Sequence, residues 1–89
     1  MPKVIVTHGV ADVETWLQFK SERADAIGSL GGRNVVDHVP GDGGSTVAVS
    51  LEVDDVAALQ AALSSPSPEV LAVMQRHGVI PPPAVFVEG

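Results

Sequence analysis

The sequence predicts a ferredoxin-like α+β domain in which strands and helices follow the order βαββαβ. Three observations support this prediction: several runs of β-branched residues, two segments with helical spacing between them, and a length of 89 residues, which suits one domain over 1–89. Right-handed crossovers place both helices on one face of a four-stranded antiparallel sheet. The expected strand order, counted along the chain, is 4-1-3-2.

The first two elements are a β-branched strand and an amphipathic helix. Residues 3–8 read Lys-Val-Ile-Val-Thr-His, which favours a strand with apolar side chains on both faces. Asp12 is a good helix N-cap, because its carboxylate can accept hydrogen bonds from the free N–H groups of the first turn. A stripe at helical spacing predicts a helix over about 12–30, and Gly31-Gly32 ends it. The stripe contains Val13, Trp16, Leu17, Lys20, Ala24 and Ile27.

The next two strands form a hairpin around a glycine-rich turn. The second strand is predicted over 33–39 and the third over 45–53, with Pro-Gly-Asp-Gly-Gly between them. The third strand alternates valine and leucine with smaller or polar residues, so its apolar face should meet the helices. The turn does not match a phosphate-binding loop, because no Lys-Ser or Lys-Thr follows it.

The second helix is predicted in two pieces. Asp54 or Asp55 caps its start, and the segment Pro66–Pro68 interrupts it, because proline cannot continue a helix interior. Ser67 then serves as a new N-cap, with Pro68 in the first helical position.

The last strand is predicted over 84–88 at an edge of the sheet, after an extended proline run at 81–83. Three of the four strands carry Val, Ile or Phe on both faces. One layer of helices covers only one face of a sheet. We therefore expect a homodimer in which a second copy covers the other face.

Composition excludes several classes of function. The net charge of −6 disfavours nucleic acids and anionic membrane surfaces as partners. The absence of cysteine removes thiolate nucleophiles and cysteine-held metals, and the three histidines lack metal-ligand spacing, so neither a metal nor another cofactor is expected. No signal peptide and no apolar run of about 18 residues is visible, which favours a cytoplasmic protein.

Three residues are candidates for ligand binding. His8 and His38 end the first two strands, so they should lie at one end of the sheet, about 9–10 Å apart, and could face each other across an organic molecule. The alternatives are a hydrogen bond to nearby backbone for His8 and a solvent-facing position for His38. Trp16, the single tryptophan, is either a pocket wall or the largest core residue.

Other polar residues have plainer interpretations. Lys20 and Arg23 should cover apolar surface with their stems while their charged ends reach water, although they could receive an acidic ligand. His77 is interpreted as structural, since a protonated imidazole suits a helix C-terminus. The strand carboxylates Asp37 and Glu52 have no pairing in their spacing, and either could be a general base only in a closed site.

The chain resembles the dimeric α/β-barrel superfamily, which includes antibiotic-biosynthesis monooxygenases, muconolactone isomerases and stress-responsive barrel proteins. The likeness is strongest to small bacterial proteins often labelled "cyclase". Their pattern His-x-Val-x-Asp-x-x-x-Trp is met here, as are Ser-Pro-Glu, Gly-Val and a proline pair. The matching residues are His8, Val10, Asp12 and Trp16, then Ser67-Pro68-Glu69, Gly78-Val79 and Pro82-Pro83.

The resemblance implies a cleft between the first helix and the sheet that holds a small apolar or aromatic ligand, with His8, Trp16 and His38 as the residues to inspect first. It implies a cofactor-free monooxygenase-like or cyclase-like enzyme as one function. No catalytic set of that superfamily can be matched in this chain, so a non-catalytic dimerisation or interaction module stays open as the alternative.

Overall fold

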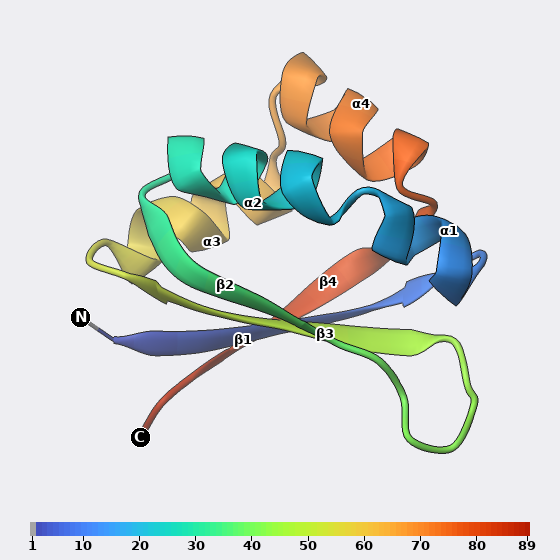
Figure 1. The fold of residues 1–89 in the computed structure, drawn as a ribbon. Helices are drawn as coiled ribbons and strands as arrows, with labels where there is room; N and C mark the ends of the chain where they lie inside the picture. Colours follow the sequence, from blue (N-terminus) through green and yellow to red (C-terminus); the bar gives the residue numbers. More distant parts are fainter. Residues whose placement is uncertain (1) are drawn as a thin grey trace.

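The computed structural model describes residues 2–89, which form one antiparallel sheet with all of its helices on one side (Figure 1). The strand order is β2-β3-β1-β4, the predicted order read from the opposite edge, so the predicted fold class is confirmed. The elements are β1 (Lys3–Val10), α1 (Val13–Gln18), α2 (Lys20–Ser29), β2 (Gly32–His38), β3 (Thr46–Val53), α3 (Val56–Ser64), α4 (Pro68–Arg76) and β4 (Val79–Val87).

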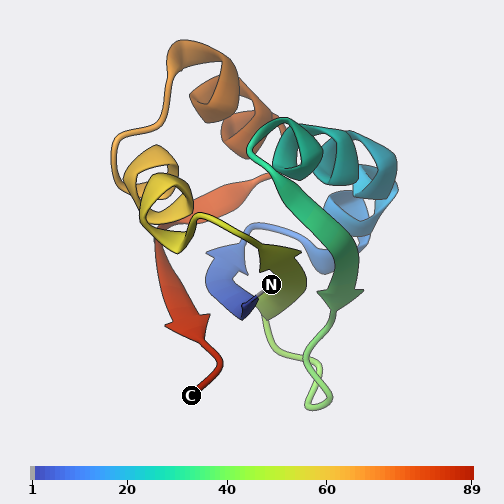
Figure 2. The same ribbon diagram turned by 90° about the vertical axis from the view of Figure 1, so that its left-hand side faces the viewer.

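The hydrophobic core lies between the helices and the two central strands. β1 pairs with β3 on one side and with β4 on the other, and alternate residues of β1 and β3 point at the helices. Figure 2 shows the helices as a layer over the concave side of the twisted sheet. The buried apolar side chains are Val4, Val6, Val10, Trp16, Val47, Val49, Leu51, Val53 and Leu59.

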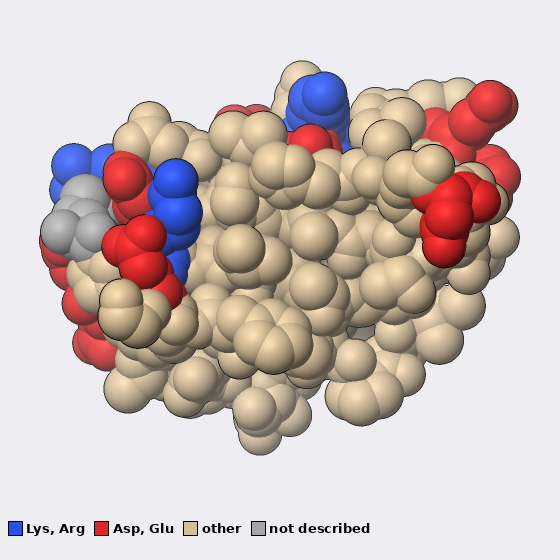
Figure 3. Space-filling view, turned by 90° about the horizontal axis from the view of Figure 1, so that it is seen from below, with Lys and Arg blue, Asp and Glu red and all other residues tan. Residues whose placement is uncertain are grey.

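The opposite face of the sheet, here called the outer face, carries apolar side chains that remain exposed. Ile5 lies beside Phe86 across the β1–β4 pair, and these side chains are 40% and 58% exposed. Val36 and Ile80 are also exposed. Charged side chains gather at the margins of this face and leave its middle free of Lys, Arg, Asp and Glu (Figure 3). Apolar residues therefore occupy both faces of the sheet, as the strand sequences indicate.

The predicted single helix over 12–30 is wrong, because the chain forms α1 and α2 with a break at Phe19. In an unbroken helix the Trp16 carbonyl would accept from the N–H four residues on. Here it accepts instead from the Phe19 N–H at 3.2 Å and from the Arg23 guanidinium at 3.1 Å. The Arg23 side chain thus caps the end of α1. The helical spacing of apolar residues in the sequence does not predict this contact.

Two strand boundaries differ from prediction by more than one residue. β1 continues past His8 to Val10, and β4 starts at Val79 and includes the proline run at 81–83. The β1–β4 register shifts between Thr7 and Gly9, opposite the prolines. An edge strand with such an irregularity tolerates residues that lack an N–H donor.

The predicted helix caps at Asp12 and Ser67 are confirmed, and Asp55 rather than Asp54 caps α3. In each case the side-chain oxygen accepts from the backbone N–H three residues further on. The interruption at Pro66–Pro68 is also confirmed, since it separates α3 from α4.

Gly32 lies at a close approach between α2 and β2, which a side chain would disrupt. A Cβ atom there would clash with the Ile27 side chain and lie 3.0 Å from a Leu51 methyl. We expect Gly32→Ala to lower the free energy of unfolding by about 1–3 kcal/mol, measured by urea denaturation. Gly28→Ala is the matched control: its Cβ would meet nothing within 4 Å, and it should raise stability by up to about 1 kcal/mol. Equal stability of the two variants would contradict this packing.

Candidate functional site

A cavity of about 100 Å³, here called the inner cavity, lies between the sheet and helices α2, α3 and α4. Its polar lining comes from His8, Arg23 and His77, and the rest of its lining is apolar. The apolar residues are Val6, Ala26, Ile27, Leu30, Val49, Leu51, Leu59, Leu63, Val70, Val73, Met74, Val79 and Pro83. Of the helices within the predicted 12–30 segment, α2 lines the cavity and α1 contributes no lining residue.

Arg23 is the most heavily bonded side chain at this cavity. Its Nε and Nη2 atoms donate to the two carboxylate oxygens of Asp37 at 3.0 and 2.7 Å, and its Nη1 donates to the Trp16 carbonyl. The guanidinium also lies over the Trp16 ring, 3.8 Å from the ring centroid. The expectation that the end of Arg23 reaches water is wrong, because Asp37 on β2 compensates its charge inside the protein. Lys20, by contrast, is exposed.

The two strand carboxylates have separate roles. Asp37 is 2% exposed in its side chain and is fully occupied by Arg23, so it positions that guanidinium. Glu52 accepts a hydrogen bond from the Asn34 amide and lies away from the inner cavity. Within residues 2–89, neither carboxylate faces the cavity as a free base.

His77 follows α4 and is buried between α2 and the cavity. Its Nε2 lies 2.8 Å from Glu22 Oε1, its Nδ1 lies 3.4 Å from Arg23 Nη1, and its ring stacks on Phe19 at 4.7 Å. Arg23 can only donate, so Nδ1 accepts and Nε2 carries the proton. Burial lowers the pKa of His77, although the hydrogen bond to Glu22 raises it. The expected protonated imidazole at the helix end is therefore replaced by a neutral, buried one.

His8 faces the inner cavity with one ring nitrogen free. Its Nδ1 donates to the Gly9 carbonyl at 3.0 Å, which is the backbone bond expected as one alternative. Nε2 is then the acceptor of the ring and has no hydrogen bond to any residue in 2–89. Burial lowers the pKa of His8 and the nearby charge of Arg23 lowers it further, although the hydrogen bond to Gly9 raises it. His8 is thus a neutral base at the edge of an apolar space.

His38 does not join this site. The cross-strand partners of His8 and His38 on β3 are adjacent residues, Val47 and Ala48, so the two histidines do lie at one end of the sheet. The side chain of His38 is exposed on the outer face, where its Nε2 lies 3.0 Å from Ser50 Oγ. The expectation that His8 and His38 face each other across one ligand is wrong, because successive strand positions point to opposite faces.

Trp16 is fully buried and is not part of the cavity lining. Its ring contacts the Arg23 guanidinium and forms a T-shaped pair with the His8 ring, with the ring centroids 6.1 Å apart. Its Nε1–H has no acceptor among the described residues. Trp16 is therefore a core residue that lies beside the cavity. It contacts two of the polar side chains that line the cavity, those of Arg23 and His8.

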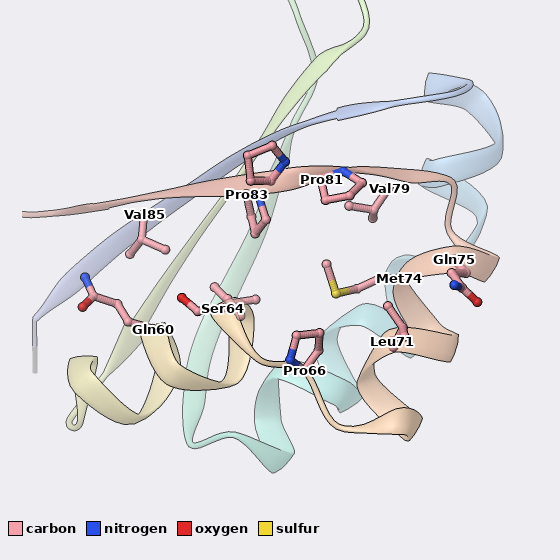
Figure 4. A pocket seen from close by; sticks show the side chains of 12 residues that line it. Gln60, Ser64, Pro66, Leu71, Met74, Gln75, Val79, Pro81, Pro83 and Val85 are labelled. Carbon is pink, nitrogen blue, oxygen red and sulfur yellow. The ribbon is translucent and has the colours of Figure 1, made fainter.

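A second hollow, here called the outer groove, was not foreseen from the sequence. It has a volume of about 570 Å³ and lies between α3, α4 and the proline run of β4 (Figure 4). It shares Leu63, Met74, Val79 and Pro83 with the inner cavity. The proline-rich break after α3 was a visible signal that the two helices separate, but a break does not reveal the space beside it.

Within residues 2–89 no cluster of three or more His, Asp or Glu side chains is arranged to hold a metal ion. In the same part of the chain, none of the helices has the length and hydropathy needed to cross a bilayer.

Two solved structures share this architecture over nearly their whole length. One is described as an antibiotic biosynthesis monooxygenase, with a TM-score of 0.64, 15% identity, and coverage of 100% of this chain and 97% of the other. The chain therefore has the same fold as this antibiotic biosynthesis monooxygenase. The other, a candidate antibiotic biosynthesis monooxygenase from Deinococcus radiodurans, gives a TM-score of 0.57 and 13% identity over 100% and 93% of the chains. No protein-family model and no curated protein sequence matches the chain. The expected resemblance is confirmed for the fold.

Acidification should destabilise the protein, because folding lowers the pKa values of His8 and His77 below 6.5. The unfolded chain then binds more protons than the folded one, so the free energy of unfolding falls as the pH drops below about 6.5. The charges facing His77 are Glu22 and Arg23 from α2, Arg76 from its own helix end, and His8 from β1 if protonated.

The measurement is urea denaturation at pH 7.5, 6.5 and 5.5, above the usual carboxylate range. His77→Gln should flatten the dependence on pH, since the amide can still donate to Glu22 but does not titrate. His38→Gln, a change on the outer face, is the matched control. An unchanged slope in His77→Gln would show that His77 does not carry the effect.

Proposed function

We propose that the protein binds a small, mainly apolar organic molecule between its helices and sheet, with His8 contacting the polar group of that ligand. The observation that supports this most directly is the free Nε2 of a neutral His8 at the edge of an apolar cavity. His8 is half-buried, and a ligand that donates a hydrogen bond to its Nε2 would satisfy an acceptor that no described residue satisfies.

The other charges at the cavity favour a neutral ligand. Arg23 is compensated by Asp37, and His77 is bonded to Glu22. A charged ligand would enter an apolar space without a free counter-charge, which is costly. A ligand with a hydroxyl group, such as a phenol or an enol, meets the requirement of His8 for a donor.

His8 also has the properties of a general base, which makes an enzyme the favoured form of this proposal. A neutral imidazole can take a proton from an acidic O–H or C–H group when its nitrogen is within hydrogen-bond reach. Proton removal is an early step in both oxygenation and cyclisation of such a ligand. The proposed activity is therefore cyclase-like or monooxygenase-like, and the second form is in keeping with the descriptions of the two structural neighbours.

The first test compares 1-naphthol with naphthalene, which lacks the hydroxyl. The indole N–H of Trp16 gives a single NMR resonance beside the cavity, and its shift on titration reports binding. We expect 1-naphthol to bind about 3–10-fold more tightly than naphthalene, the worth of one net hydrogen bond. His8→Ala should abolish that preference.

His38→Ala is the matched control, because it removes an imidazole from the outer face and should keep the preference for 1-naphthol. The alternative function, a non-catalytic dimerisation or interaction module, is favoured by the uncharged outer face and by the small volume of the cavity. A Trp16 resonance that no probe shifts would favour that module over the ligand-binding proposal.

We further propose that the outer face pairs with a second copy of the chain. The exposed side chains of Ile5, Val36, Ile80 and Phe86 support this, because contiguous apolar surface on a small domain gains stability when covered. The charge-free middle of the face with charges at its margin is typical of a protein interface.

Light scattering during gel filtration tests the homodimer. The unaltered protein should have twice the mass of one chain, and Phe86→Lys should shift it to the single chain or weaken dimerisation at least about tenfold. Leu71→Lys is the matched control: Leu71 is also apolar and exposed, but it lies on α4 on the helix side. A single-chain mass for the unaltered protein at micromolar concentration would contradict the dimer.

A further inference from the structure

We propose that Met74 is a gate between the inner cavity and the outer groove, and that the ligand occupies both spaces when Met74 swings aside. The proposal rests on the function proposed above and extends it to the size of the ligand. Its polar group meets His8 in the inner cavity, while its larger part lies in the outer groove under the prolines of β4.

The volumes require a joined site. A dry apolar cavity of about 150 Å³ binds one benzene molecule, and the inner cavity has only about 100 Å³. The outer groove, at about 570 Å³, is within the range of about 300–1,000 Å³ typical of ligand pockets. An organic molecule that reaches His8 must therefore extend into the groove through the wall that separates the two spaces.

Four residues form that wall, and they differ in how freely they can move. Val79 and Pro83 belong to β4, where sheet pairing and the proline ring hold them. Leu63 is branched and comes from the last turn of α3. Met74 is unbranched with three rotatable side-chain bonds, is half-buried, and extends from α4 toward β4 (Figure 4). Rotation of Met74 therefore opens the wall with the least disturbance.

The chemistry of the groove limits the ligand. Its polar side chains are Gln60, Ser64 and Gln75, and no charged residue lines it. The remaining surface is apolar, from Leu71, Pro66 and the β4 prolines. The geometry thus fits an elongated, uncharged ligand of more than one ring, with a hydroxyl at the buried end.

The test measures the affinities of phenol and 1-naphthol from the Trp16 indole resonance in three variants. Met74→Ala should bind 1-naphthol about tenfold more tightly than the unaltered protein, and Met74→Phe about tenfold more weakly, because the first opens the wall and the second blocks it. The change should be larger for 1-naphthol than for phenol. Val39→Ala is the control, since Val39 is exposed and lines neither the groove nor the inner cavity, and its affinities should change less than about threefold.

The outcomes separate this proposal from the one it rests on. If 1-naphthol shifts Trp16 equally in all variants, the gate is refuted while ligand binding stands. If 1-naphthol shifts Trp16 in neither the unaltered protein nor Met74→Ala, ligand binding at His8 is refuted, and the gate with it. If Met74→Ala does not fold, Met74→Phe still tests the proposal. An affinity of Met74→Phe for 1-naphthol equal to that of the unaltered protein would overturn the gate.

Discussion

The buried pair of Arg23 and Asp37 is the interaction on which the arrangement of the helices depends. It joins α2 to β2, and through the Trp16 carbonyl it also fixes the end of α1. With side chains 7% and 2% exposed, neither partner could stay charged inside the protein without the other. The same guanidinium contacts His77, so the position of α4 relative to α2 is set from this pair as well.

The pair also decides what the cavity can recognise. Because Asp37 occupies the Nε–Nη2 edge of the Arg23 guanidinium, the most basic group in the lining is already neutralised. Glu22 accepts a hydrogen bond from Nε2 of the neutral His77. His8 is left as the polar group with unused hydrogen-bonding capacity, and the electrostatics of the whole site are those of a neutral acceptor in an apolar wall.

The sequence predicted the fold well because local signals agreed with one another. Alternation in β3, the caps at Asp12 and Ser67 and the break at Pro66–Pro68 each depend on short stretches of chain. The site was less predictable, because it depends on contacts between distant residues. Arg23 looked like a surface cation until β2 brought Asp37 beside it, and His38 seemed to face His8 because its strand face could not be fixed through the bulge in β2.

The cavity has one weakly anchored side. No residue within α4 is buried, and its side chains at the wall are only half-covered, whereas β1 and β3 contribute most of the core. Segments with little buried apolar surface detach locally at a free energy below that of global unfolding. A molecule bound in the inner cavity can therefore exchange with solvent while the sheet stays intact. The lifetime of that molecule is then set by the rate at which α4 detaches locally.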